Sequence, residues 1–150
     1  MEEINATIIS LLAADGRMSF TELARRTGLS VSAAQQRVRR LEQRGVIKGY
    51  SAVVSAEEIG LPLTAFVSIR AFDPAAPDDA PVRLAHLAAI EACHSVAGEA
   101  SYILKVRVAS PRALEDLLQE IRAAANVSTH TTIVLSTPFE NRPPSPGGGS

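Results

Sequence analysis

Two helix signals follow one another closely in the first third of this chain. Ser19 precedes the first helix and Glu22 follows three positions later, which is the arrangement of a capping box. Gly28 ends this helix, because glycine readily takes the left-handed conformation beyond a helix terminus. Ser30 is a second cap residue, and the helix that it opens extends to Arg44. Two helices joined by so short a turn predict a helix-turn-helix.

Apolar residues at helical spacing predict a further helix before this pair and a buried face on the last helix. The stripe of the first helix is Ile4, Ile8, Leu11 and Leu12, and Asp15-Gly16 stops it. At about 100° per residue, the packing face of the last helix is formed by Val31, Ala34, Val38 and Leu41. We therefore expect the three helices to share one core.

The opposite face of the helix from Ser30 to Arg44 carries amide and guanidinium groups and no acid. A solvated polar face is the common alternative, but such faces usually mix charges of both signs. Amides and guanidiniums hydrogen-bond base edges in a major groove, and arginines also bind phosphates. We therefore predict binding to double-stranded DNA, with a bridge to the protein scaffold as the alternative role of Arg37. The predicted contacts are Ser30, Ser32, Gln35, Gln36, Arg37, Arg39, Arg40, Gln43 and Lys48.

The next segment, residues 46–54, is rich in β-forming residues and contains Gly49. We predict a strand or narrow hairpin here, the wing of a winged helix, with Lys48 contacting a phosphate. The charge distribution agrees with this division of the chain. The net charge is −1, yet residues 1–54 contain eight Lys or Arg and five acids, whereas the remainder contains seven and eleven. Such asymmetry indicates that only the first part meets a polyanion.

The second half alternates strand and helix signals in the order βαββαβ. Strands are expected at 62–73, 91–97, 101–109 and 127–138. The first helix has Leu84, Leu87 and Ala88 on one face, and the second, from about Pro111, has Leu114, Leu117, Leu118 and Ile121. This order predicts a ferredoxin-like domain and an α+β fold class. Because both helices cover the same face of such a sheet, the other face is uncovered and self-association is expected.

Catalysis is the main competing function for a ferredoxin-like domain. The candidate groups are Cys93, His86, His94 and His130. Cys93 and His94 are neighbours on a predicted strand and so point to opposite faces, which prevents a nucleophile–base pair. No HExxH, GxSxG or GxxxxGKS/T pattern occurs, and one cysteine forms neither an internal disulfide nor a multi-cysteine metal cage. We interpret Cys93 as a small buried residue and the histidines as surface or interface groups, and we expect no enzyme, cofactor or metal.

A dense set of short motifs runs through the first half. They are Asp15-Gly16-Arg17, Glu22-Leu23-Ala24, Gly28-Leu29-Ser30, Arg37-Val38-Arg39-Arg40-Leu41-Glu42, Gly45-Val46-Ile47, Gly49-Tyr50 and Gly60. In this combination the chain resembles the Lrp/AsnC family, the leucine-responsive or feast/famine regulators, and its actinobacterial members most closely. The likeness extends to about residue 139. Where the family commonly opens its first helix with Leu-Asp, this chain has Ile4-Asn5.

The resemblance implies that the second half is a RAM domain, which forms homodimers by apposing two sheets and octamers as tetramers of dimers. It also implies an amino acid or related metabolite bound where dimers meet, near the loop between the second and third strands. Ser101 stands where the family usually has the acid that meets the ligand's ammonium group, and Glu99 is an alternative source of that charge. A plain hairpin turn also explains Gly98. The candidate effector contacts are Gly98, Glu99, Ala100, Ser101 and Tyr102.

We therefore predict a winged helix-turn-helix at 1–54, a hinge at 55–61, a RAM domain at 62–139 and a disordered Pro/Gly-rich tail at 140–150. The start lacks a cationic signal sequence and no apolar run is long enough to span a bilayer, so we expect a cytoplasmic, nucleoid-associated protein without a membrane partner. The predicted function is sequence-specific transcription regulation controlled by an amino acid. The alternatives are an effector-independent regulator or architectural DNA-binding protein, and a winged-helix module that binds proteins.

Overall fold

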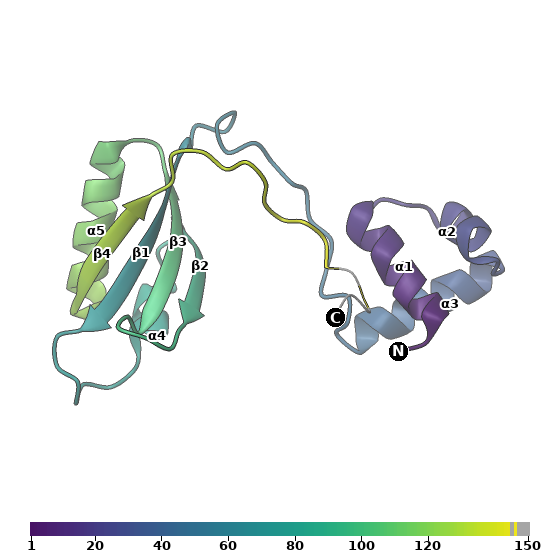
Figure 1. The fold of residues 1–150 in the computed structure, drawn as a ribbon, viewed down its shortest axis with the longest axis horizontal. Helices are drawn as coiled ribbons and strands as arrows, with labels where there is room; N and C mark the ends of the chain where they lie inside the picture. The colour runs from purple at the N-terminus through teal and green to yellow at the C-terminus, as the bar shows by residue number, and fades with distance from the viewer. Residues whose placement is uncertain (145, 147–150) are drawn as a thin grey trace. The chain divides into compact units, whose positions relative to one another are not determined.

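The computed structural model describes residues 1–144 and residue 146, and it divides the chain into two compact units (Figure 1). One unit contains residues 1–53 and the described residues from Phe139 onward, and the other contains residues 54–138. Each unit has its own apolar core. Since each core is complete within its unit, the two units are described separately.

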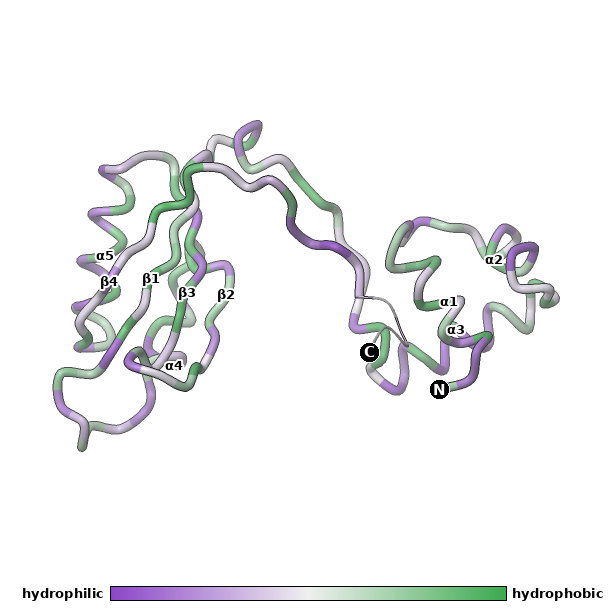
Figure 2. The backbone as a smooth tube through the Cα atoms, viewed as in Figure 1, coloured by the Kyte–Doolittle hydropathy of each residue, from purple (hydrophilic) through white to green (hydrophobic). Residues whose placement is uncertain are grey.

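Three helices form the first unit: α1 (Glu3–Ala14), α2 (Phe20–Thr27) and α3 (Val31–Gln43). The predicted core is confirmed at most positions, and Figure 2 shows the apolar stretches of these helices in green. The buried residues are Ile8, Leu12, Leu23, Ala24, Ala34, Val38 and Leu41. The prediction was wrong for Val31, which is 46% exposed. Helical spacing specifies a position around the axis, but it does not say whether a neighbouring helix reaches the first turn.

Both predicted serine caps are present. Ser19 accepts a hydrogen bond from the backbone N–H of Glu22, and Ser30 accepts one from the backbone N–H of Ala33. The reciprocal half of the predicted capping box is replaced, because the Glu22 carboxylate accepts hydrogen bonds from Arg25 and Arg26 instead. Two guanidiniums one turn away offer this carboxylate hydrogen bonds in which both partners are charged, whereas a backbone amide offers a neutral donor.

The predicted wing strand is absent from the described chain. Residues 44–62 contain no strand, and the segment after α3 is irregular. Two backbone N–H groups, those of Val46 and Ile47, turn back to the carbonyl oxygen of Leu41, and Ile47 packs against the helical core. The prediction of a strand from β-forming residues failed because a strand also needs a partner strand to accept its hydrogen bonds.

The second unit is the predicted ferredoxin-like fold. Its elements are β1 (Leu63–Ala71), α4 (Ala80–Leu84), β2 (Ile90–Ser95), β3 (Tyr102–Val108), α5 (Pro111–Ala125) and β4 (Val127–Ile133). The strands are ordered β2-β3-β1-β4, and all neighbours are antiparallel. The core lies between one face of the sheet and the two helices, where Val67, Leu104, Leu117 and Ile121 pack together. The other face is uncovered, as expected.

Two connecting segments complete the described chain. Residues 55–61, predicted as a hinge, form a hydrogen-bonded turn in which the N–H of Leu61 donates to the carbonyl oxygen of Ala56 at 2.8 Å. Residues 141–144 of the predicted disordered tail are exposed and irregular, whereas residues 145 and 147–150 lie outside the described residues. No helix among the described residues has the length and apolar character that crossing a membrane requires.

Candidate nucleic-acid interface and ligand hollows

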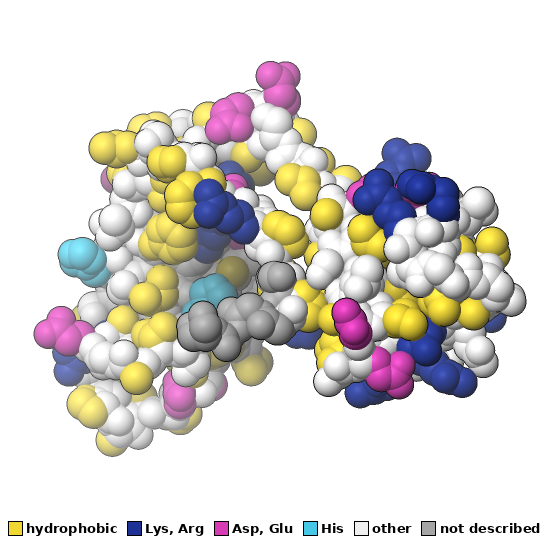
Figure 3. Space-filling view, turned by 45° about the vertical axis from the view of Figure 1, so that its right-hand side comes forward, with side chains coloured by type: hydrophobic (Ala, Val, Ile, Leu, Met, Phe, Trp, Pro, Cys, Tyr) yellow, Lys and Arg dark blue, Asp and Glu magenta, His cyan; other side chains and the backbone are white. Residues whose placement is uncertain are grey.

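The predicted DNA-binding residues lie on one side of α3 and at its two ends. Seven of them are exposed: Ser30, Ser32, Gln36, Arg39, Arg40, Gln43 and Lys48. Gln35 and Arg37 are half-buried. In Figure 3 the dark-blue Lys and Arg side chains gather in several places on the helical unit. The opposite side of α3 packs on the other helices through apolar side chains, since Ala34, Val38 and Leu41 are buried in the core. A rigid helix thus presents amides and guanidiniums to solvent, as major-groove recognition requires.

Arg37 is tied to the protein itself. Its guanidinium donates to the Glu2 carboxylate at 2.6 Å and to the side-chain oxygen of Asn5 at 3.1 Å. The hydrogen bond from Arg37 lowers the pKa of Glu2 below its usual value, and the charges of Arg37 and Arg40 act in the same direction. Arg37 therefore connects α3 to the start of α1, the scaffold role that the sequence left open. Arg39 and Arg40 form no ion pair within the described chain.

The partners of Arg37 were missed by sequence reasoning. They lie 32 and 35 positions away in the chain, and no periodic pattern or motif connects them. The only local signal was the half-buried angular position of Arg37 on the predicted helix. Arg37 and its two partners help to line a hollow of about 220 Å³. The lining residues are Glu2, Asn5, Arg37, Arg40, Leu41, Gln43 and Arg44.

The predicted effector loop closes the hairpin between β2 and β3 and crosses the end of β1. The Ser101 N–H donates to the carbonyl oxygen of Ile69 at 2.9 Å, and the Ser101 carbonyl accepts from Val96 at 3.1 Å. Gly98 has a φ of 147°, a backbone conformation that favours glycine. The loop separates two hollows of about 550 and 350 Å³. Ser101 and Tyr102 line the larger one, whereas Glu99 and Ala100 line the smaller one.

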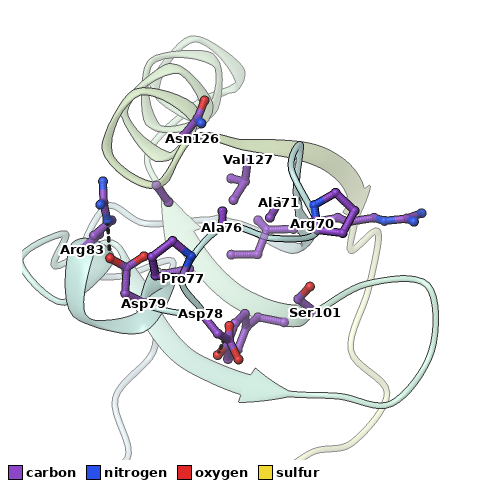
Figure 4. A pocket seen from close by; sticks show the side chains of 15 residues that line it. Arg70, Ala71, Ala76, Pro77, Asp78, Asp79, Arg83, Ser101, Asn126 and Val127 are labelled. Carbon is purple, nitrogen blue, oxygen red and sulfur yellow. Dashed lines mark hydrogen bonds and ion pairs between the residues drawn. The ribbon is translucent and has the colours of Figure 1, made fainter.

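The larger hollow lies between the β1–α4 loop, the end of β1 and the junction of α5 with β4 (Figure 4). The Tyr102 hydroxyl donates to Asp78 at 2.7 Å and so joins the effector loop to the β1–α4 loop. This hydrogen bond, together with burial, raises the pKa of Tyr102. Arg83 of α4 donates to Asp79, the next residue after Asp78, at 2.8 Å. Because carboxylates, guanidiniums and apolar side chains all line it, the hollow suits a small polar molecule with an apolar part.

The candidate catalytic groups do not form a site. The register places Cys93 opposite Leu104 and His94 opposite Ile103, so the two side chains point to opposite faces, as predicted. Cys93 is exposed, and the prediction that it is buried was wrong. It lies on the edge strand β2, beside an open hollow that Pro81 and Leu84 of α4 also line. His86, His94 and His130 are on the surface. No group of three potential metal ligands occurs within the described part of the chain.

A helix-turn-helix with an acid-free exposed face and a separate sheet domain with ligand-sized hollows define a DNA-binding regulator that carries a ligand-binding module. Comparison with known families agrees with this class. Residues 1–48 match the family described as winged helix-turn-helix DNA-binding, and residues 64–144 match the Lrp/AsnC ligand binding domain. The chain belongs to the Lrp/AsnC family of transcriptional regulators.

Individual relatives are similar over nearly the whole chain. The HTH-type transcriptional regulator LrpA of Mycobacterium tuberculosis is 58% identical, with 95% of each chain covered. The leucine-responsive regulatory protein of Escherichia coli K12 is 36% identical, over 90% of this chain and 85% of that one. Among solved structures, the M. tuberculosis feast or famine regulatory protein complexed with L-methionine is 57% identical, with a TM-score of 0.95 over 97% of this chain and 99% of that chain.

Proposed function

We propose that the exposed face of α3 binds a specific site on double-stranded DNA, and that it does so from a homodimer. The observation that carries this proposal is the composition of that face, which has amides and guanidiniums but no acid and is backed by a buried apolar stripe. The assigned contacts are Ser30, Ser32, Gln35, Gln36, Arg39, Arg40 and Gln43, with Lys48 on a phosphate. Arg37 supports the helix through Glu2.

The DNA-binding proposal is tested by titrating the full chain against its own promoter fragment by fluorescence anisotropy at several salt concentrations. Each neutralised phosphate contributes about 0.9 to the slope of log affinity against log salt, so several contacts give a steep slope. Arg39→Ala should weaken binding by about tenfold or more, since a good base contact is worth about 1–3 kcal/mol. Arg112→Ala is the matched control, because Arg112 is an exposed arginine of the other unit. Affinity that is flat in salt, or equal for the two variants, contradicts the proposal.

We also propose that the uncovered face of the sheet joins two copies of the chain and that dimers assemble further into octamers. The helices cover only one face of the four-stranded sheet. On the other face Phe66 is exposed and Ile103 is half-buried. A C2 pair of such faces buries both apolar patches at once. A dimer also fits DNA recognition, because two copies of α3 then bind two half-sites. Sedimentation of the full chain tests this, and a monomer at micromolar concentration contradicts it.

The ligand that we propose is an α-amino acid, bound at the loop from Gly98 to Tyr102 where assembled copies meet. The loop lies between two hollows that contain carboxylates, guanidiniums and apolar walls, the groups that an amino acid needs. A relative at 57% identity was solved with L-methionine. Ser101 offers a hydroxyl instead of an acid, so Glu99 supplies the negative charge for the ammonium group. We propose no catalytic role, and we place the protein with the chromosomal DNA in the cytoplasm.

A thermal-shift screen of the twenty amino acids, L-methionine among them, tests the ligand proposal. A ligand that binds only the folded state adds about 2.7 kcal/mol of stability at a hundred times its Kd, which is a shift of several degrees. Glu99→Gln should reduce the shift, whereas Glu115→Gln, which changes an exposed acid on α5, should leave it unchanged. If no amino acid shifts the transition, the regulator acts without an effector or responds to another metabolite.

A further inference from the structure

One row of side chains crosses the uncovered face of the sheet and has a histidine at each end. The register pairs His94 with Ile103, Ile103 with Ser68, and Ser68 with His130. Successive residues of a strand alternate between faces, so these four side chains share the face that α4 and α5 leave open. Both imidazoles are exposed in the single chain. If this face pairs with a second copy, both lose their contact with water.

Charged side chains of both signs surround this row. Lys105 lies two residues after Ile103 on β3, so it is a diagonal neighbour of His94 on the same face. Arg70 lies two residues after Ser68 on β1, so it is a diagonal neighbour of His130 on that face. Arg107 follows Lys105 on β3, and both form ion pairs with Glu91 of β2, at 2.9 and 3.6 Å. Glu99 of the β2–β3 loop lines the hollow that also contains Arg70 and His130. The sheet and this loop therefore supply three cations against two acids.

We propose that His94 and His130 make the pairing of two chains sensitive to pH, so that the homodimer forms only when these imidazoles are neutral. The proposal rests on the face-to-face homodimer proposed above. Histidine is the side chain that changes charge between about pH 5 and 8. A charged imidazole taken out of water beside Lys105 or Arg70 loses hydration and gains like-charge repulsion, and both effects oppose association.

The direction of the effect follows from proton linkage. The separated chains bind more protons than the dimer does, so acidification favours separation. The dimer dissociation constant then rises by up to about tenfold per pH unit for each imidazole that must release its proton. Both imidazoles are expected to contribute, because each has a cation and an acid nearby: Lys105 with its partner Glu91 beside His94, and Arg70 with Glu99 in the hollow that His130 lines. DNA affinity decreases as the dimer dissociates, since a single chain contacts one half-site only.

Sedimentation equilibrium of the full chain at about pH 8 and about pH 5.5, at constant ionic strength, tests the proposal. We expect the wild type to dissociate at least about tenfold more readily at the lower pH. The double variant His94→Gln with His130→Gln should have equal dissociation constants at both values, and His94→Gln alone should remove part of the difference. The matched control is His86→Gln, an exposed histidine between α4 and β2, which should behave as the wild type does.

Circular dichroism at each pH confines the comparison to conditions in which the chain is folded. A wild-type dimer of equal stability at both pH values overturns the proposal and leaves the dimer itself intact. A double variant that still separates on acidification also overturns it, because another group is then the sensor. A wild type that is monomeric at about pH 8 contradicts the underlying face-to-face pairing, which is a different outcome from either of these.

Discussion

Ser30 caps α3 and is also a predicted DNA contact, so substitutions at this position can separate the stability of the helix from its affinity for DNA. Its side chain accepts the N–H of Ala33 at 3.2 Å, and its backbone has the extended conformation of a cap residue. Loss of such a cap costs about 1 kcal/mol. The helical unit has 53 residues before the tail, and at about 2.1 cal/mol/K per residue its unfolding entropy is near 0.11 kcal/mol/K. Ser30→Ala should therefore lower the melting temperature of this unit by about 9 °C.

Two further substitutions at Ser30 keep the cap and change only the charge. Asn and Asp both cap helices as well as Ser does, so Ser30→Asn and Ser30→Asp should melt close to the wild type. Asp, however, adds a carboxylate at the start of the helix that we propose enters the groove. Ser30→Asp should then lose about tenfold or more in DNA affinity, whereas Ser30→Asn retains it. Calorimetry and anisotropy on the same samples measure both effects.

Melting temperature and DNA affinity should respond to different substitutions at Ser30. If Ser30→Asp binds DNA as well as the wild type, the N-terminus of α3 does not approach the phosphates and the assigned interface is wrong. If Ser30→Ala melts as the wild type does, the cap hydrogen bond is not what stabilises the first turn of α3.

Three other substitutions probe the two cores and the loops. Leu41→Ala empties a fully buried site and should destabilise the helical unit by about 2–5 kcal/mol in denaturant unfolding; a loss below 1 kcal/mol would mean that α3 is held elsewhere. The pKa of Glu22 is lowered to about 2 by its two arginine partners, so its contribution to stability is complete above its ordinary value of 4.5 and is lost as the pH falls toward 2. Glu22→Gln should thus reduce stability at neutral pH but not at about pH 2, and equal losses at both would contradict this. Tyr102→Phe removes the hydrogen bond to Asp78 and should speed amide exchange in the β1–α4 loop; unchanged exchange would show that the bond does not restrain the loop.

Features encoded by neighbouring residues could be predicted from the sequence. The serine caps and the apolar stripes of α1, α3 and α5 depend on local chemistry. The βαββαβ order follows from the alternating strand and helix patterns of residues 62–138. Recognition of the family added the assignment of the loop at Gly98, for which periodicity alone allows only a hairpin turn. The assignment of the exposed face of α3 also needed no long-range information, because its angular position follows from the buried residues alone.

Features that depend on distant partners could not be predicted. The ion pair of Arg37 with Glu2 joins residues 35 positions apart. The segment after α3 has the composition of a strand but no partner strand within the described chain, and Cys93 is exposed on the edge strand β2. In each case the outcome depends on which parts of the chain lie nearby in the fold, and the local sequence does not contain that information.

The separation of the two units limits how an amino acid can control DNA binding. A ligand changes an equilibrium only through states that it binds unequally. The loop from Gly98 to Tyr102 and the exposed face of α3 lie in different compact units with independent cores. A ligand at the loop therefore has two routes: it changes how copies of the sheet domain assemble, or it changes the turn at residues 55–61. The loop lies at the end of the same sheet whose uncovered face we assign to pairing, so the first route requires no rearrangement inside either core. The effector then acts on the contacts between dimers, and pH acts on the dimer itself. Because only dimers assemble further, an amino acid that strengthens assembly should shift the acid dissociation of the dimer to lower pH.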